Sequence, residues 1–211
     1  MAVTFDLFGT LVDVAYPEDP GVAVADALRE YGAEVPDDWD DAYREVHIDA
    51  PDGAEVPLPA HVAATLRSRG VDSPDNAARR AVITAFDPDV TTRPGAVEAV
   101  EAARDAGPVG LLSNCSVPEL VARTLIRSDL DRRGFDAITT SVACGWRKPH
   151  PQAFEAVARN LDVDPSALVH VGDDPASDGG VEDVGGTFVT LETTTLDDFA
   201  NDLRDGRYSW R

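Results

Sequence analysis

Lysine is nearly absent from this sequence, and the resulting charge imbalance limits the partners that the chain can have. The 211 residues include one lysine, Lys148, and 17 arginines, against 39 acidic residues, which gives a net charge of −21. A field of this sign and size repels nucleic acid and anionic membrane surfaces. We therefore expect neither as a partner.

Cysteines and long apolar runs are also scarce. Two cysteines, Cys115 and Cys144, could pair, but two cysteines in a cytoplasmic chain are more often free thiols. No run of 18 apolar residues occurs, so no transmembrane helix is expected. The chain starts with an apolar strand pattern and lacks a basic n-region, which predicts no signal peptide and a cytoplasmic protein. With 43% hydrophobic and 27% charged residues, the composition is typical of a folded globular chain.

Five short apolar runs predict the strands of a parallel sheet. Several are almost continuously apolar or β-branched, as in strands that are buried on both faces. They cover Val3–Phe8, Val109–Ser113, Ala137–Ser141, Leu168–Gly172 and Thr187–Leu191. Helical patterns separate them at Pro94–Ala106, at Pro151–Leu161 and after a Ser116-Val-Pro-Glu119 capping box. This alternation predicts an α/β fold with a doubly wound, parallel five-stranded sheet and ligands beyond the carboxyl ends of the strands.

Residues 16–92 interrupt this alternation. They contain no convincing strand but four helical patterns, at Val22–Tyr31, Trp39–Asp49, Pro59–Arg69 and Pro74–Phe86. The stretch is too long for a single crossover between two strands. We therefore expect a helical domain at 16–92, inserted into a core formed by 1–15 and 93–211. The alternative is a set of helices that packs directly on the sheet.

Four polar stretches lie beside the predicted strand ends, where such a fold places its ligand site. In chain order they are DLFGTL, which begins at Asp6, LLSNCS with Ser113, GWRKPHP with Lys148, and HVGDDPASD with Asp173, Asp174 and Asp178. Each stretch alone has an ordinary explanation, because acidic loops are usually solvated and a Lys-Pro pair is usually a surface turn. Their common position at strand ends favours one site.

The residue types in these stretches are suited to phosphoryl chemistry. A carboxylate such as Asp6 can act as a nucleophile and form a covalent intermediate. Gly9 and Thr10 provide backbone N–H groups that can cradle an anion. The Ser113 hydroxyl and the Lys148 ammonium can hold a transferring phosphoryl group. Because the chain otherwise uses arginine, its single lysine indicates a need for a compact ammonium group.

The aspartates supply the ligand type that Mg²⁺ prefers. Asp6 together with the later aspartates offers hard oxygen ligands, and Mg²⁺ bound in this way keeps several waters and bridges to a substrate phosphate. The sequence therefore predicts Mg²⁺ as the cofactor and a small phosphorylated molecule as the substrate.

Taken together and in this order, the four stretches resemble the motifs of the haloacid dehalogenase-like (HAD) hydrolase superfamily, in its capped, phosphatase-like subclass. The resemblance implies that residues 16–92 are the cap domain. It also implies Asp6 as the nucleophile and Lys148 as the group that orients nucleophile and phosphate, with Ser113 binding phosphate and Asn114 lining the site. The metal would be bound by Asp6, the backbone carbonyl of Phe8 and Asp173, with Asp178 or Asp174 completing or supporting the coordination.

Phe8 departs from the phosphatase pattern, in which an aspartate at this position protonates the leaving oxygen and later activates water. Loss of such a group typically costs a factor of about 10²–10⁴ in rate. Three hypotheses about the hydrolytic reaction follow. The preferred one is a Mg²⁺-dependent phosphoryl hydrolase or transferase whose acid/base group is weak or lies elsewhere, with His47, His61 and Asp13 as candidates. The second is a 2-haloacid dehalogenase, since the dehalogenases of the superfamily have a tyrosine here, but these need no metal and lack the aspartate cluster.

The third reading, phosphonate cleavage through a cap lysine, fails because residues 16–92 contain no lysine. A binding module that retains the phosphate cradle without turnover is a further alternative from a different class. Specificity would come from the cap, where Arg44, His47, His61 and Arg67 are candidate contacts.

The composition also resembles that of proteins from extreme halophiles. In molar salt the Debye length shrinks to about 3 Å, which screens the repulsion among carboxylates. An ordinary acidic protein with an arginine bias is the alternative.

Overall fold

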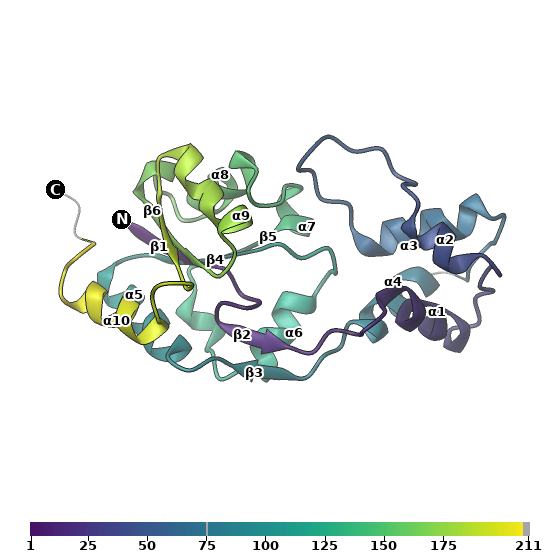
Figure 1. The fold of residues 1–211 in the computed structure, drawn as a ribbon, viewed down its shortest axis with the longest axis horizontal. Coiled ribbons are helices and arrows are strands. Elements are labelled where there is room, and N and C mark those ends of the chain that lie inside the picture. The colour runs from purple at the N-terminus through teal and green to yellow at the C-terminus, as the bar shows by residue number, and fades with distance from the viewer. Residues whose placement is uncertain (75, 209–211) are drawn as a thin grey trace.

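The computed structural model describes residues 1–74 and 76–208 and has a parallel five-stranded sheet at its centre (Figure 1). The strand order is β5-β4-β1-β6-β7. The strands are β1 (Ala2–Phe5), β4 (Val109–Ser113), β5 (Ala137–Thr140), β6 (Leu168–Gly172) and β7 (Thr187–Thr190). All five predicted strands are present with small differences at their ends, and the predicted α/β fold class is confirmed.

The sheet is buried on both faces because successive side chains of each strand enter different cores. Phe5, Leu111 and Val169 belong to one core, and Ala2, Leu112 and Leu168 belong to the other. The first face is covered by α5 (Ala96–Ala106), α6 (Leu120–Arg127) and α10 (Leu196–Arg204), and the second by α8 (Pro151–Asn160) and η3 (Gly179–Val184). Short elements complete this part of the chain, namely η1 (Arg132–Gly134), α7 (Ser141–Cys144), η2 (Pro165–Ala167) and α9 (Pro175–Asp178).

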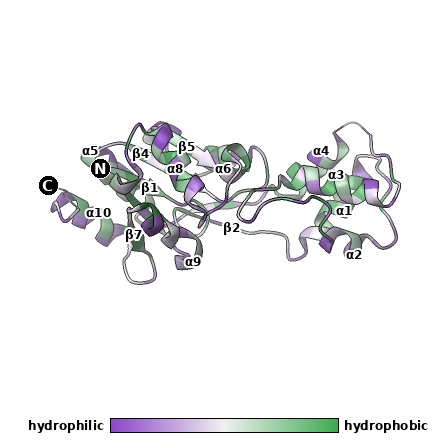
Figure 2. Cartoon of the chain, turned by 90° about the horizontal axis from the view of Figure 1, so that it is seen from above, coloured by the Kyte–Doolittle hydropathy of each residue, from purple (hydrophilic) through white to green (hydrophobic). Residues whose placement is uncertain are grey.

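Four helices form a separate group beside the sheet, visible at the right of Figure 1 and again in the view from above in Figure 2. They are α1 (Pro20–Glu30), α2 (Trp39–Arg44), α3 (Leu58–Ser68) and α4 (Ala77–Ala85). The connection to the sheet runs through two short antiparallel strands, β2 (Val12–Val14) and β3 (Val90–Thr92). In the chain, β2 precedes the four helices and β3 follows them.

Several local predictions were wrong. The expected helix Trp39–Asp49 ends at Arg44, because Glu45 has an extended backbone and its N–H bonds back to the Ala42 carbonyl. The His47 ring donates a 2.7 Å hydrogen bond to the same carbonyl. The expected helix Pro74–Phe86 starts only at Ala77, and residue 75 of that range lies outside the described residues. Residues 209–211 of the expected core lie outside them as well.

The predicted capping box before α6 does not form. Glu119 itself is the N-cap residue, with a left-handed φ of 68° and no capping hydrogen bond from its side chain. Its carboxylate instead accepts a hydrogen bond from Arg79 on α4, at 2.6 Å. The prediction that 16–92 lacks strands also missed β3, whose three residues are too few for a periodic signal.

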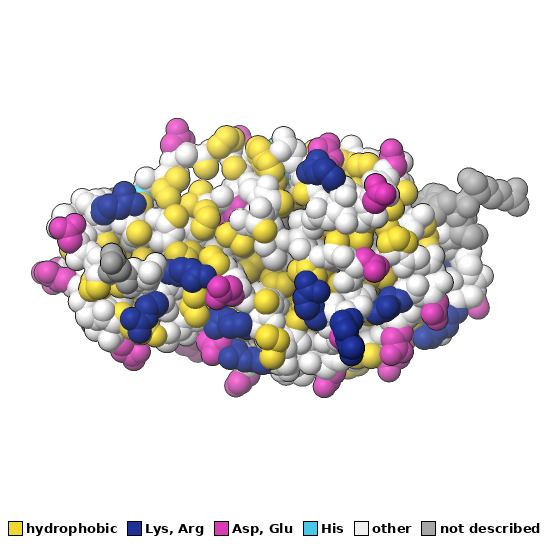
Figure 3. All heavy atoms as spheres, turned by 180° about the vertical axis from the view of Figure 1, so that it is seen from behind, with side chains coloured by type: hydrophobic (Ala, Val, Ile, Leu, Met, Phe, Trp, Pro, Cys, Tyr) yellow, Lys and Arg dark blue, Asp and Glu magenta, His cyan; other side chains and the backbone are white. Residues whose placement is uncertain are grey.

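Arginine and acidic side chains share the surface with apolar ones, as the face in Figure 3 shows. Several form ion pairs between the helical group and the sheet part. Arg123 and Arg127 of α6 both lie 2.6 Å from Asp87, which follows α4. Cys115 and Cys144 are free thiols, as expected. No helix in the described ranges is both long and apolar enough to cross a membrane.

Candidate active site

Asp6 lies directly after β1, the central strand of the sheet. Its backbone N–H donates a 2.9 Å hydrogen bond to the Val171 carbonyl of β6, and its side chain is 11% exposed. The neighbouring strands end beside it, since Ser113 is the last residue of β4 and Asp173 follows β6. The carboxyl ends of three adjacent strands therefore bring motif residues from distant parts of the sequence together.

Lys148 is the buried cation of this site. Its Nζ lies 2.7 Å from Asp6 Oδ1 and 2.6 Å from Asp178 Oδ1, and the side chain is 1% exposed. Burial alone would lower the pKa of Lys148, but the charges of Asp6 and Asp178 outweigh burial and raise it. Lys148 therefore stays an ammonium group, paired with both carboxylates.

The two carboxylates that share Lys148 differ in their surroundings. Burial raises the pKa of Asp6 to about 6, against the opposing charge of Lys148. Burial would also raise the pKa of Asp178, but hydrogen bonding by His170 and the charge of Lys148 hold it well below its usual range. Asp178 is thus the fixed counter-ion of Lys148.

His170 anchors Asp178 from inside β6. Its Nε2 lies 3.1 Å from Asp178 Oδ1 and its Nδ1 lies 2.9 Å from Thr4 Oγ1. Burial lowers the pKa of His170, so the ring is neutral. An ionised carboxylate only accepts hydrogen bonds, so the ring proton is on Nε2. The Nε2–H group donates a hydrogen bond to Asp178, and Nδ1 accepts one from the Thr4 hydroxyl.

Asp173 is held over the loop that follows Asp6. Thr10 Oγ1 donates a 2.7 Å hydrogen bond to Asp173 Oδ1. Gly9 has a left-handed φ of 85°, and a Cβ at this position would collide with the Asp173 carboxylate. The side chain of Thr10 thus orients Asp173, a role that the sequence analysis did not assign to it.

The carboxylates are close enough to share a cation. Asp6, Asp173 and Asp178 each offer a ligand oxygen, and these atoms lie within 4.8 Å of one another. Three carboxylates beside one ammonium leave an excess of two negative charges, which fits a divalent cation. Asp174, in contrast, is exposed and accepts a 3.0 Å hydrogen bond from Ala176 N–H, which caps α9. This geometry favours Asp178 over Asp174 in the cluster.

Ser113 and Asn114 have different roles. Ser113 is fully buried, and its hydroxyl has no hydrogen-bond partner among the described residues. A buried hydroxyl without a protein partner is suited to donate a hydrogen bond to an anionic group of the substrate. Asn114 accepts from Lys148 N–H at 2.8 Å and donates to the Lys148 carbonyl at 2.9 Å, so it fixes the backbone of the lysine.

A cavity of about 430 Å³ opens at this position, and we call it the Asp6 pocket. Phe8, Lys148 and Asp173 line it together with Asp6. So do Tyr16 and Arg147, which the sequence analysis missed. Only the position of Arg147 directly before Lys148 could have indicated it.

Tyr16 packs beside Phe8 at the edge of the pocket, with the two ring centroids 6.0 Å apart. Burial, followed by the charges of Cys115 and Asp6, holds the pKa of Tyr16 above its ordinary value, so its hydroxyl keeps its proton.

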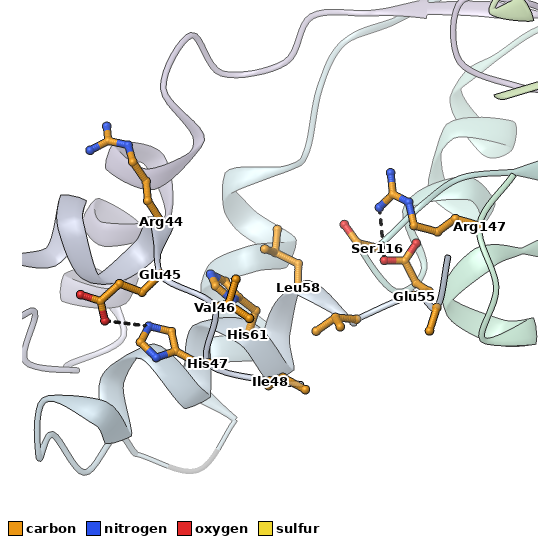
Figure 4. A pocket seen from close by; sticks show the side chains of 12 residues that line it. Arg44, Glu45, Val46, His47, Ile48, Glu55, Leu58, His61, Ser116 and Arg147 are labelled. Carbon is orange, nitrogen blue, oxygen red and sulfur yellow. Dashed lines mark hydrogen bonds and ion pairs between the residues drawn. The ribbon is translucent and has the colours of Figure 1, made fainter. Parts of the chain in front are cut away.

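The candidate acid/base groups proposed for the cap do not reach the Asp6 pocket in this structure. His47 and His61 line a different pocket, and their Nε2 atoms lie 2.7 Å from the Ala42 carbonyl and 2.8 Å from the Tyr43 carbonyl (Figure 4). Asp13 lies on β2 and is exposed. The helix-terminal carbonyls around α2 account for both histidines, which are therefore structural here.

A model of the haloacid dehalogenase-like hydrolase family matches residues 1–179 of the chain. The chain belongs to this family. The HAD-like fold is shared with solved structures that cover nearly the whole chain. A 2-haloacid dehalogenase from Pseudomonas syringae pv. Tomato DC3000 is 22% identical, with a TM-score of 0.69 and coverage of 100% of this chain and 99% of that chain.

A HAD phosphatase and a protein solved with bound phosphate have nearly the same sequence identity to the chain. A HAD phosphatase from Thermococcus onnurineus is 20% identical, with a TM-score of 0.57 and coverage of 97% and 96%. CbbY from Rhodobacter sphaeroides, solved in complex with phosphate, is 19% identical, with a TM-score of 0.58 and coverage of 95% of both chains. No curated protein gives a significant match. At these identities the structural likeness establishes the fold, and both dehalogenases and phosphatases share it.

Proposed function

We propose that this HAD-like hydrolase is a Mg²⁺-dependent phosphatase of small phosphorylated molecules, with Asp6 as the nucleophile. The observation that supports this most strongly is the group of Asp6, Asp173 and Asp178, whose ligand oxygens lie within 4.8 Å of one another beside a buried Lys148. The excess of negative charge suits a divalent cation, and the unpaired Ser113 hydroxyl suits a phosphate oxygen.

In the proposed reaction, the free oxygen of Asp6 attacks phosphorus and the bond from phosphorus to the ester oxygen breaks. The leaving group departs with that electron pair as an alkoxide or phenoxide and then takes a proton from water, and phosphoryl-Asp6 remains. Lys148 and Ser113 stabilise the charge on the phosphoryl oxygens. Water then attacks phosphorus, releases inorganic phosphate and regenerates Asp6. Lys148 keeps Asp6 in position, and Asp178 with His170 keeps Lys148 in position.

The residues that would bind Mg²⁺ are Asp6, Asp173 and the Phe8 carbonyl, with Asp178 in support. When bound, the metal would neutralise charge between nucleophile and phosphate. Thr10 would serve this site indirectly, because its hydroxyl fixes one oxygen of Asp173 and leaves the other oxygen free.

We further propose that residues 16–92 form a cap domain and that 1–15 and 93–211 form the core. In support, α1 to α4 lie apart from the sheet, and β2 and β3 are the paired strands that connect them to it (Figure 1). Backbone hydrogen bonds also tie the two parts together, for example from Glu55 N to the Gly145 carbonyl at 2.9 Å. A cytoplasmic location and the absence of nucleic-acid and membrane partners stay predictions from charge and composition.

One observation favours a second candidate, a 2-haloacid dehalogenase. The aromatic ring of Phe8 follows Asp6 by two residues, and a halide leaves without a proton, so this chemistry needs no acid at that position. The aspartate cluster argues against it, because that reaction uses no metal, and without a bound cation the three carboxylates would repel the carboxylate of a haloacid.

Trapping the covalent intermediate tests the proposed mechanism. An aryl phosphate mixed with the protein in molar KCl and Mg²⁺ and quenched in acid should leave phosphate on Asp6, identified by mass spectrometry of the peptide. The Asp6→Asn variant should show neither the adduct nor turnover. Wild-type turnover without any phosphoryl-Asp6, even in a rapid-quench experiment, would contradict the proposed nucleophile.

A further inference from the structure

A second pocket adjoins the Asp6 pocket, and Arg147 lines both. This second cavity, which we call the bridging pocket, measures about 370 Å³. Figure 4 shows Arg147, Ser116 and Glu55 at its core side and His47 and His61 at its helical side. Arg147 borders both cavities. A substrate with its phosphate at Asp6 would therefore have its leaving group close to Arg147.

The Arg147 guanidinium is hydrogen-bonded through one nitrogen, and the rest of the group is accessible to a ligand. Its Nη1 donates a 3.5 Å hydrogen bond to Glu55 Oε1, and the side chain is 49% exposed. Its other donors have no hydrogen-bond partner within residues 1–74 and 76–208. Glu55, in contrast, is 2% exposed and also accepts a hydrogen bond from Ser141. A buried carboxylate thus orients Arg147 and leaves most of its five N–H donors free.

The backbone around Arg147 is also fixed. Arg147 N–H donates to the Gly53 carbonyl at 2.9 Å, and Glu55 N–H donates to the Gly145 carbonyl at the same distance. The loop between α2 and α3 therefore pairs with the residues just before Lys148. Preorganisation of this kind lowers the entropic cost of binding a ligand.

Charge indicates what Arg147 would bind. Lys148 and Arg147 are the cations that line the Asp6 pocket in the described part of the chain, and Lys148 is already paired with Asp6 and Asp178. Arg147 is thus the cation available to a group outside the reacting phosphate. Its planar fork suits the bidentate binding of a carboxylate or phosphate.

We propose that Arg147 binds a second anionic group on the leaving part of the substrate. The substrate class is then a small phosphate monoester that also has a carboxylate or a second phosphate, with its carbon skeleton against Val46, Ile48 and Leu58 of the bridging pocket. This inference rests on the proposed phosphatase function for the identity of the reacting group.

Matched pairs of aryl phosphates test it. The kcat/KM values of para-carboxyphenyl phosphate and of its neutral carboxamide analogue are measured for wild type, Arg147→Ala, Arg147→Gln and Arg159→Ala. Arg159 is an exposed arginine on α8, so its variant controls for the loss of one positive charge. A phenylene bisphosphate as third substrate distinguishes a second phosphate from a carboxylate.

For wild type and Arg159→Ala, kcat/KM should be about tenfold higher for para-carboxyphenyl phosphate, or for the bisphosphate, than for the carboxamide analogue. This ratio corresponds to about 1.4 kcal/mol. Both Arg147 variants should lose this preference, mainly through KM. The ratio of two substrates on one protein sample does not depend on the folded fraction, so a partly unfolded variant still gives an answer. The same ratio in wild type and in both Arg147 variants would overturn the proposal.

A binding measurement separates this inference from the phosphatase function. Calorimetric titration with para-hydroxybenzoate and para-hydroxybenzamide needs no turnover. If wild type releases no phosphate from any ester, the proposed function fails. Tighter binding of the benzoate that depends on Arg147 would still support the anion site, and equal binding of both compounds by wild type would overturn it.

Discussion

The rings of Phe8 and Tyr16 lie 6.0 Å apart, centroid to centroid, and together give the Asp6 pocket an aromatic wall. A wall of this kind has no carboxylic acid to protonate a leaving oxygen. Tyr16 is the one group on it with a proton, and the raised pKa of its hydroxyl makes it a weak acid.

The first prediction concerns this wall. Without an acid at Phe8, the leaving oxygen departs as an anion, so aryl and acyl phosphates should react far faster than alkyl phosphates. Phe8→Asp should raise turnover of alkyl phosphates by about 10²-fold and flatten the dependence of log kcat on leaving-group pKa. The measurement is a series of aryl and alkyl phosphates on both proteins.

The control for this series is Tyr16→Phe, which removes the remaining hydroxyl of the wall. If wild type cleaves alkyl and aryl phosphates at similar rates, another group already acts as the acid. A steep dependence that appears only in Tyr16→Phe would then identify Tyr16 as that group. His47 and His61 are poor alternatives, because both rings are engaged with backbone carbonyls near α2.

The second prediction concerns Ser113, whose buried hydroxyl lacks a partner in the described structure. If it binds a phosphate oxygen, Ser113→Ala should reduce kcat/KM by about tenfold to a hundredfold, the range for a hydrogen bond to a charged group. The free energy of unfolding without substrate should hardly change, since no protein hydrogen bond is lost. Urea denaturation of the variant, together with its kinetics, checks both parts, and a large loss of stability would contradict the assigned role.

The third prediction concerns Lys148 as the shared partner of two buried carboxylates. Lys148→Ala would leave Asp6 and Asp178 without their cation and should destabilise the fold by about 3–5 kcal/mol. Chemical denaturation at neutral pH measures this, with Arg159→Ala as the matched loss of one charge at the surface. A destabilisation no larger than that of the control would mean that the pair is not buried in solution.

The sheet was predictable from the sequence, because continuous apolar runs mark strands buried on both faces. The place of most candidate site residues was predictable as well, because they follow strand ends. The strands β4 and β6 have the predicted bounds, and Asp6, Lys148 and Asp173 line one pocket. The capping box at Ser116 failed for a tertiary reason, since Glu119 pairs with Arg79 instead. Contacts of that kind have no local signal.

The same limit applies to the pocket walls. Tyr16 takes its place through the fold of the segment before α1, and nothing in its immediate sequence specifies this contact. Arg147 takes its place through the pairing with the α2–α3 loop, and its position before Lys148 is its only local signal. The proposed roles of Asp174 and Asp178 also depend on hydrogen bonds that only the structure shows. The bond from Ala176 N–H to Asp174 and the bonds of His170 and Lys148 to Asp178 separate two residues that the sequence left as alternatives.

The fourth prediction follows from the net charge of −21. Repulsion among carboxylates should be screened, and apolar burial strengthened, as KCl rises into the molar range. The melting temperature should therefore increase between about 0.1 M and about 2 M KCl, a range chosen to span weak and strong screening. An unchanged melting temperature would contradict the halophilic interpretation and favour an ordinary acidic protein.

The fifth prediction separates the two hydrolytic reactions that share this fold. A panel of phosphate esters and 2-haloacids, assayed in molar KCl with Mg²⁺ or with a chelator, measures the release of phosphate and halide side by side. Asp6→Asn should be inactive toward either class and so serves as the blank. We expect phosphate release that requires Mg²⁺ and no halide release. Release of halide from a 2-haloacid, unaffected by the chelator, would contradict the account.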